Sequence, residues 1–153
     1  MENKKLNSNI KDMENYLSKW QRILRLLDWD IKIELVEKEW RKTGDIKIDS
    51  DDKTAILLIN VFNPKQTNLE ELIIHELLHL KLWDLDQLTE SLIDAVFCSK
   101  EDDIKKELVH TNFMQILECT VNDLAKSFLL ESGDDKSISY GRLEKIIKDE
   151  LGE

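Results

Sequence analysis

Residues 68–82 read NLEELIIHELLHLKL, and this stretch predicts the helix around which the fold is built. The run opens with a capping-box pattern, which is typical of a helix N-terminus. Nearly every later position is apolar, so we expect the helix to be buried on most sides. Between Leu72 and Leu80 three polar residues interrupt the apolar run: His75, Glu76 and His79. Buried polar side chains are costly unless something compensates them, so these three residues are the first candidates for a functional site.

Periodic apolar positions predict the elements on either side of this helix. Alternating apolar residues favour strands, and apolar spacing of three and four residues favours helices. Before residue 68 we expect a helix at 10–27 and strands at 31–36, 45–49 and 54–62. After residue 82 we expect helices at about 86–98, 102–130 and 141–151.

The order of these elements predicts an α+β fold in a single domain of 153 residues. An N-terminal helix and a small antiparallel or mixed three-stranded sheet form one lobe, at about 10–82. A helical lobe occupies about 83–153, with the helix at 68–82 between the two lobes. Residues 1–9 are expected to be a flexible tail.

The charge and the cysteine content exclude several classes of protein. Acidic residues outnumber basic ones by 32 to 22, giving a net charge of −10 that repels nucleic acid and anionic membranes. We find no targeting segment or membrane span, so a cytoplasmic location is expected. Cys98 and Cys119 lack a Cys-x-x-Cys spacing, and we expect both to be reduced, buried, apolar residues.

The spacing of His75, Glu76 and His79 suits metal chemistry. Residues four apart lie on one face of a helix, so the two imidazoles can point at one position, as tetrahedral Zn²⁺ requires. Glu76 projects beside that position, where it can accept a proton from a metal-activated water and pass it to a departing amine. The pattern predicts a zinc-dependent peptidase. The alternative is a pair of hydrogen-bonded core histidines.

A catalytic zinc of this kind needs a third protein ligand and one open position for water. In one large class of zinc peptidases that ligand is a histidine six residues after the second histidine, with a glycine three residues after it. Leu85 and Leu82 occupy these two positions here, so that class is excluded.

Among the acidic residues, Glu118 is our candidate third ligand. Glu90 and Glu107 lie in stripes with other polar residues and read as parts of solvated faces, whereas Glu118 lies at the edge of an apolar face. The alternative is a hydrated carboxylate at the rim of that face, or one paired with Lys126. Asn122, one turn further on, could hold a ligand imidazole by a hydrogen bond to its second nitrogen.

Two features of the substrate site remain open in the sequence. His110 and Tyr140 are candidates for the donor that stabilises the oxyanion, although neither lies in a local motif and His110 also suits an ordinary position on its helix. Peptides commonly add as a strand to a sheet edge, and we expect residues 54–62 to be that edge.

The motif residues of the helix at 68–82 and those of the helix at about 102–130 together resemble a known family. The run His75-Glu-Leu-Leu-His79, followed by Glu118 and by Asn122-Asp-Leu-Ala125, resembles the gluzincins, in particular the ImmA/IrrE family and small phage-associated or minimal gluzincins. The resemblance spans roughly residues 20–130. It implies a zincin-like fold, a glutamate as third zinc ligand, and a regulatory protein of a mobile element or phage as substrate. Thermolysin-like enzymes carry a supporting acid where this chain has Asn122.

Two positions depart from the family pattern: many ImmA-type members have Gly at Leu78, and Phe is common at Leu124. Two other functions also stay open. The chain can be a latent or regulatory module that binds zinc without independent peptidase activity, or a nonenzymatic interaction protein whose motif is accidental. The sequence indicates neither the oligomeric state nor the cleavage specificity.

Overall fold

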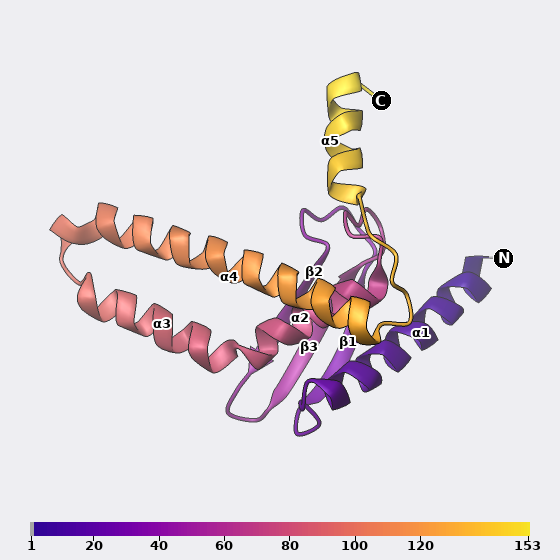
Figure 1. Ribbon diagram of the computed structural model, residues 1–153, viewed down its shortest axis with the longest axis horizontal. Helices are drawn as coiled ribbons and strands as arrows, with labels where there is room; N and C mark the ends of the chain where they lie inside the picture. The colour runs from indigo at the N-terminus through magenta and orange to yellow at the C-terminus, as the bar shows by residue number, and fades with distance from the viewer. Residues whose placement is uncertain (1) are drawn as a thin grey trace.

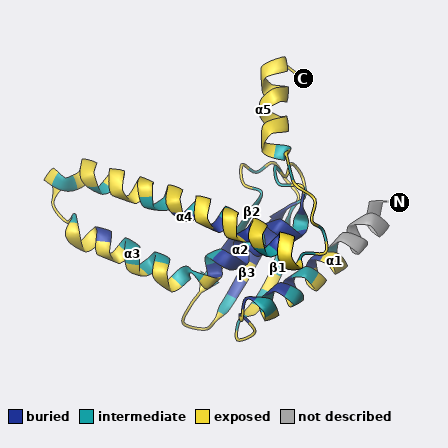
Figure 2. Ribbon diagram, in the orientation of Figure 1, coloured by how far each residue is buried: buried dark blue, intermediate teal, exposed yellow. Residues whose placement is uncertain are grey.

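The computed structural model describes the backbone of residues 2–153 and the side chains from residue 10 onward. It has a mixed α+β fold, which confirms the predicted class, with most of its buried residues in the sheet and in the helices packed on it (Figures 1 and 2). In chain order the elements are α1 (Glu2–Ile23), β1 (Asp30–Val36), β2 (Gly44–Asp49), β3 (Thr54–Asn60), α2 (Leu69–Lys81), α3 (Trp83–Val96), the 3₁₀ turn η1 (Lys100–Asp102), α4 (Asp103–Ser132) and α5 (Gly141–Leu151).

Helix α1 differs from the prediction at both ends. It begins at Glu2, and the side chains of the expected tail, residues 1–9, lie outside the described residues. It ends at Ile23 rather than at residue 27, because Arg25 adopts a left-handed φ of 57°. The amide of Leu26 then donates to the carbonyl of Gln21 at 2.7 Å, which closes the helix end without a glycine.

The sheet has the order β1-β3-β2, with β1 parallel and β2 antiparallel to β3. Strand β3 is therefore the central strand, and our expectation that it forms an open edge is wrong. Its nearly continuous apolar sequence suits a strand that is paired on both sides and covered by helices. The strand ends at Asn60, whose side-chain amide donates to the carbonyls of Trp40 and Lys42.

The core lies between the sheet and the helices, and α2 runs through its centre (Figure 1). Helix α2 contacts α1, β2, α3 and α4, which explains why it is apolar on most sides. The buried residues of α4 recur every four positions along its C-terminal half and form the face that packs on α2. These residues are Leu117, Val121, Ala125 and Leu129.

Glu70 is fully buried at the start of α2 and joins three parts of the chain. Its carboxylate accepts hydrogen bonds from Lys19 Nζ at 3.0 Å and from the Trp20 indole at 2.8 Å, both on α1. It also accepts the backbone amides of Asp134 and Asp135, each at 2.8 Å. Four charge-assisted or neutral donors compensate the buried carboxylate, and they fix the segment that follows α4.

The segment between α4 and α5 is also hydrogen-bonded to the N-terminus of α2, and these bonds position the start of α5. The side-chain amide of Asn68 donates to the carbonyls of Asp135 and Ser137, each at 2.8 Å, while its oxygen caps α2 as predicted. At Gly141 a Cβ atom would clash with the carbonyl oxygen of Lys65. Only a glycine allows this approach, so the first residue of α5 lies directly against the loop that precedes α2.

Helices α3 and α4 form a hairpin that extends away from the sheet (Figure 1). Cys98 and Cys119 are both exposed on this hairpin, which contradicts the expectation that they are buried. Cys119 lies on the side of α4 away from the buried residues that pack on α2, and Cys98 lies in the turn between α3 and η1. None of the described helices is long and apolar enough to cross a bilayer.

Candidate metal centre

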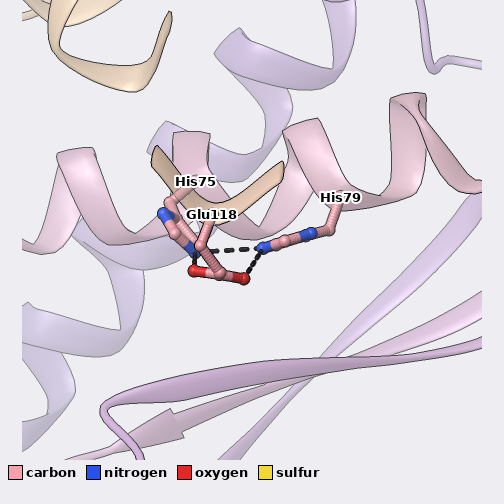
Figure 3. Close-up of side chains that lie close together, drawn as sticks. All are labelled: His75, His79 and Glu118. Atoms are coloured by element: carbon pink, nitrogen blue, oxygen red, sulfur yellow. Dashed lines mark hydrogen bonds and ion pairs between the residues drawn. The ribbon is translucent and has the colours of Figure 1, made fainter. Parts of the chain in front are cut away.

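Three of the predicted site residues converge at the surface of α2. His75 and His79 project from one face of α2, and Glu118 reaches them from α4 (Figure 3). The two Nε2 atoms lie 3.1 Å apart. Glu118 Oε1 lies 2.9 Å from His79 Nε2, and Oε2 lies 3.5 Å from His75 Nε2. Among the described residues this is the group of histidine, cysteine, aspartate and glutamate side chains that could hold a metal ion.

Helix packing explains how Glu118 comes to this position. Leu117 and Val121 are buried against α2, and Glu118 follows Leu117 directly along α4. One step of about 100° around the helix places its side chain at the border of that contact, next to the histidines. The partly exposed carboxylate is thus held by its neighbours in the core.

The spacing of the donor atoms suits a zinc ion. Bonds of about 2.0–2.2 Å in a tetrahedron place neighbouring donor atoms about 3.3–3.6 Å apart. The three measured separations of 2.9, 3.1 and 3.5 Å are close to this range. Two imidazole nitrogens and one carboxylate are also a donor set that zinc accepts, with a fourth position left for water.

The two histidines differ in their affinity for a proton. Burial lowers the pKa of His75 to about 4, the charge of His79 acts in the same direction, and Glu118 together with a side-chain hydrogen bond to Asn122 opposes both. Burial also disfavours the charged form of His79, but the hydrogen bond and charge of Glu118 outweigh it and raise the pKa of His79. A neutral His75 is ready to bind a metal without losing a proton.

The Glu118 carboxylate is stabilised in its charged form. Its hydrogen bond with His79 lowers the pKa of Glu118, partial burial opposes this, and the charges of both histidines and of Arg142 add to the lowering. An ionised carboxylate is the form that coordinates a metal. Asn122 also lies where the sequence places it, one turn along α4 and in contact with the His75 ring.

Glu76 is buried beside this cluster and is not one of its donors. The pKa of Glu76 is raised to about 7, mainly by burial; the charges of Asp45 and Glu118 contribute to the rise, and those of His79 and Lys42 oppose it. A carboxyl group with a pKa near the ambient pH can both accept and release a proton. This property suits a residue that transfers protons rather than one that binds metal.

Strand β2 approaches Glu76 closely. A Cβ atom at Gly44, the first residue of β2, would lie 3.1 Å from Glu76 Oε1 and 2.8 Å from Leu72 Cδ1. The strand can lie this near to α2 because Gly44 has no side chain. The carboxyl group is therefore held between a helix and the end of a strand.

The cluster opens into a cavity of about 810 Å³. Its walls come from β2 and the loop before it, from α2 and the loop before it, from the start of α3, from the middle of α4, and from one side of α5. Gly44 and the α5 residues have no recognisable pattern in the sequence, and only packing brings them to the site. The amphipathic pattern of α5 indicates a helix but does not show which element it faces.

The two candidates for oxyanion stabilisation lie elsewhere. His110 is on α4 and interacts with Glu90 of α3 at 3.1 Å, and Tyr140 is exposed just before α5. Neither residue is part of the cavity wall that the structure describes. Glu90 and Glu107, which the sequence excluded as ligands, also lie outside the cluster.

Comparisons of this chain with protein-family models, with curated proteins and with solved structures find no match.

Proposed function

We propose that this chain is a zinc-dependent peptidase of the gluzincin type. The observation that carries the proposal is the convergence of His75, His79 and Glu118 in an open cavity, with Glu76 buried beside them. Two ligands four residues apart, a third on another helix and an adjacent carboxyl group together suit hydrolysis of a peptide bond. A zincin-like fold and a cytoplasmic location are parts of the same proposal.

Each residue of the site has a separate task in this reaction. His75, His79 and Glu118 hold the ion, and Asn122 orients the His75 ring. Zinc, when bound, supplies Lewis-acid activation of the water and of the scissile carbonyl. Glu76 accepts a proton from the attacking water and then delivers it to the nitrogen of the departing amine. Hydrolysis consumes one water for each peptide bond broken.

Strand β2, rather than β3, is the edge at which we expect a substrate to bind. It is the outer strand on the side of the cavity, and Ile46 and Ile48 line that cavity. The amide of Asn60 donates to the carbonyl of Thr43, so alternation along the antiparallel pair turns the backbone groups of Ile46 and Ile48 away from β3. The amide of Ile46 already donates to Asp45 Oδ1 at 3.0 Å, so an extended peptide can bond to the Ile46 carbonyl and to the backbone groups of Ile48 as an added strand.

A proline in β2 tests this edge. Ile48→Pro removes an N–H that points away from β3, and prolines are tolerated at such edge positions. We expect KM for a peptide substrate to rise about fivefold to tenfold, as for the loss of a hydrogen bond of about 1 kcal/mol, with zinc affinity unchanged. Ile48→Ala, which keeps the N–H and shortens the side chain, is the control. An equal rise of KM in both variants would show that the backbone group is not used.

Removal of the metal tests the function as a whole. We expect the purified chain to bind about one equivalent of zinc and to cleave an unfolded protein such as casein. Chelation should abolish cleavage, and added zinc should restore it. Cleavage that persists in the chelated protein contradicts the proposal. Zinc binding without cleavage indicates a regulatory zinc module instead, and absence of zinc binding indicates a nonenzymatic interaction protein.

The resemblance to ImmA/IrrE proteins suggests the kind of substrate. We propose that it is a regulatory protein of a mobile element or phage. Proteins with similar sites can act on different substrates, so this part of the proposal depends on the resemblance alone. Loss of such a regulator in cells that express the chain, but not in cells that express an inactive variant, is the corresponding test.

A further inference from the structure

Positive side chains gather at one end of the cavity. Arg41 and Lys42 lie in the loop before β2, Lys65 lies in the loop before α2, and Arg142 and Lys145 lie on the first turns of α5. The close contact of Gly141 with the Lys65 backbone brings the last two of these segments together. All five cations line the same cavity, although they come from three separate parts of the chain.

Most of these cations have no acidic partner. Lys42 forms an ion pair with Asp45 at 2.9 Å. Within the part of the chain that the structure describes, Arg41, Lys65, Arg142 and Lys145 form none. Other lysines and arginines of the described chain also lack an ion pair, so what distinguishes these four is that they gather on the wall of one cavity.

Six carboxyl groups also line the cavity, and they lie at different places along it. Glu76 and Glu118 belong to the reaction centre, and Asp45 already pairs with Lys42 and with Lys47. Three further carboxyl groups line the cavity: Glu71, Asp86 and Asp149. Asp86 lies at the opposite end, on the first turn of α3. Burial raises the pKa of Glu71, and the charges of Lys126 and Arg142 oppose this. Asp149 lies on α5, one turn beyond Lys145, and it forms no ion pair among the described residues.

We propose that the cavity end formed by Arg41, Lys65, Arg142 and Lys145 binds acidic side chains of the peptide substrate. This inference rests on the proposed peptidase function and adds to it the class of substrate. An extended peptide on β2 passes from the zinc ligands towards α5, and carboxylates at that end would meet four cations that lack partners. The net charge of −10 on the whole chain repels acidic ligands elsewhere, so attraction is confined to this end.

Nucleic acid is the other common polyanion, and the structure favours peptide over it. The cationic residues surround a cavity with a strand edge on one wall, and such an edge bonds to a peptide backbone. A binding site for nucleic acid usually presents a basic face on a chain of positive charge. Here the cations are few, and the remainder of the molecule is strongly acidic.

The test measures binding rather than turnover. The full chain carrying Glu76→Gln, loaded with zinc, is titrated against fluorescent peptides of alternating Glu and Ala, and against a matched series in which Gln replaces Glu. We expect the acidic peptide to bind about tenfold more tightly at low salt, and the difference to shrink as salt screens the charges. Equal affinity for the two peptides, or no binding of the acidic peptide, overturns the inference.

Charge reversal on α5 locates the site. We expect Arg142→Glu with Lys145→Glu to remove the preference for the acidic peptide. Lys148→Glu is the matched control, because Lys148 lies on the same exposed helix but outside the cavity wall. No residue of α5 is buried, so both variants should keep the helical content that circular dichroism measures. An equal loss of the acidic-peptide preference in the Lys148→Glu control contradicts the inference. So does a single-stranded oligonucleotide that binds as tightly as the acidic peptide and whose binding depends on Arg142 and Lys145.

The two proposals can fail separately. Peptide cleavage by the zinc-loaded wild-type chain, with no preference for acidic sequences among the products, would leave the peptidase in place and remove the acidic site. A preference for acidic peptides that depends on Arg142 and Lys145, in a chain that never cleaves them, would leave the acidic site and remove the peptidase.

Discussion

Replacing Glu76 by Gln should reduce kcat for peptide hydrolysis by about a thousandfold, within the range of about 10² to 10⁴ that general acid–base groups contribute. Gln has the same size as Glu, so it fits the space between α2 and Gly44 without a new clash. It cannot accept the proton of the attacking water at neutral pH. Zinc affinity should stay within about twofold of the wild-type value, because Glu76 is not among the converging donors.

The measurement is a pair of assays on one preparation: steady-state kinetics on a cleaved peptide, and metal content after dialysis. Glu90→Gln is the control, since it makes the same chemical change on α3, where Glu90 interacts with His110 outside the cavity. Unchanged kcat in Glu76→Gln would falsify the role of Glu76 in proton transfer. Loss of zinc together with activity would show that Glu76 supports the metal centre instead.

Replacing Glu118 by Ala should weaken zinc binding by about a thousandfold. Zinc sites in small domains contribute roughly 10–16 kcal/mol, and one ligand of three is expected to supply about 4 kcal/mol of this. The side chain is 45% exposed, so the variant should fold normally. Isothermal titration or competition with a coloured chelator measures the affinity directly, independently of any activity.

The control for this prediction is Glu107→Ala, which removes an exposed carboxylate from the same helix. If Glu107→Ala binds zinc as tightly as wild type while Glu118→Ala does not, the loss is specific to the cluster. If both variants bind zinc with wild-type affinity, Glu118 is a rim carboxylate near two histidines and not a ligand. In that case His79→Ala should still lose the metal. This variant therefore distinguishes a zinc site that does not use Glu118 from a cluster that does not bind zinc at all.

Local sequence was sufficient for much of the fold. The period of apolar residues identifies the helices and strands, because each secondary structure repeats its side-chain directions over a few residues. The same reasoning places His75 and His79 on one face of α2, since this relation depends on a single helix. Errors at element ends have local causes that are weak in sequence, such as the left-handed Arg25 that ends α1 without a glycine.

Sequence was less informative wherever packing decides exposure. Cys98 and Cys119 lie in apolar surroundings in the sequence, yet both are exposed, because the α3–α4 hairpin extends beyond the sheet and nothing in the described chain covers its outer side. Strand β3 reads equally well as a buried centre or as an apolar edge. Its place between β1 and β2 depends on a crossover that no short stretch of sequence contains.

The sequence by itself thus determined the elements and the local geometry of the HELLH run, because these depend on residues within one or two turns of each other. Only the tertiary structure decided that Glu118 meets the two histidines, that β2 is the open edge beside Glu76, and that the cations of α5 line the same cavity. These relations join residues separated by tens of positions. Their physical cause is the packing of the apolar faces of α2 and α4 and the anchoring of the segment before α5 by Glu70 and Asn68.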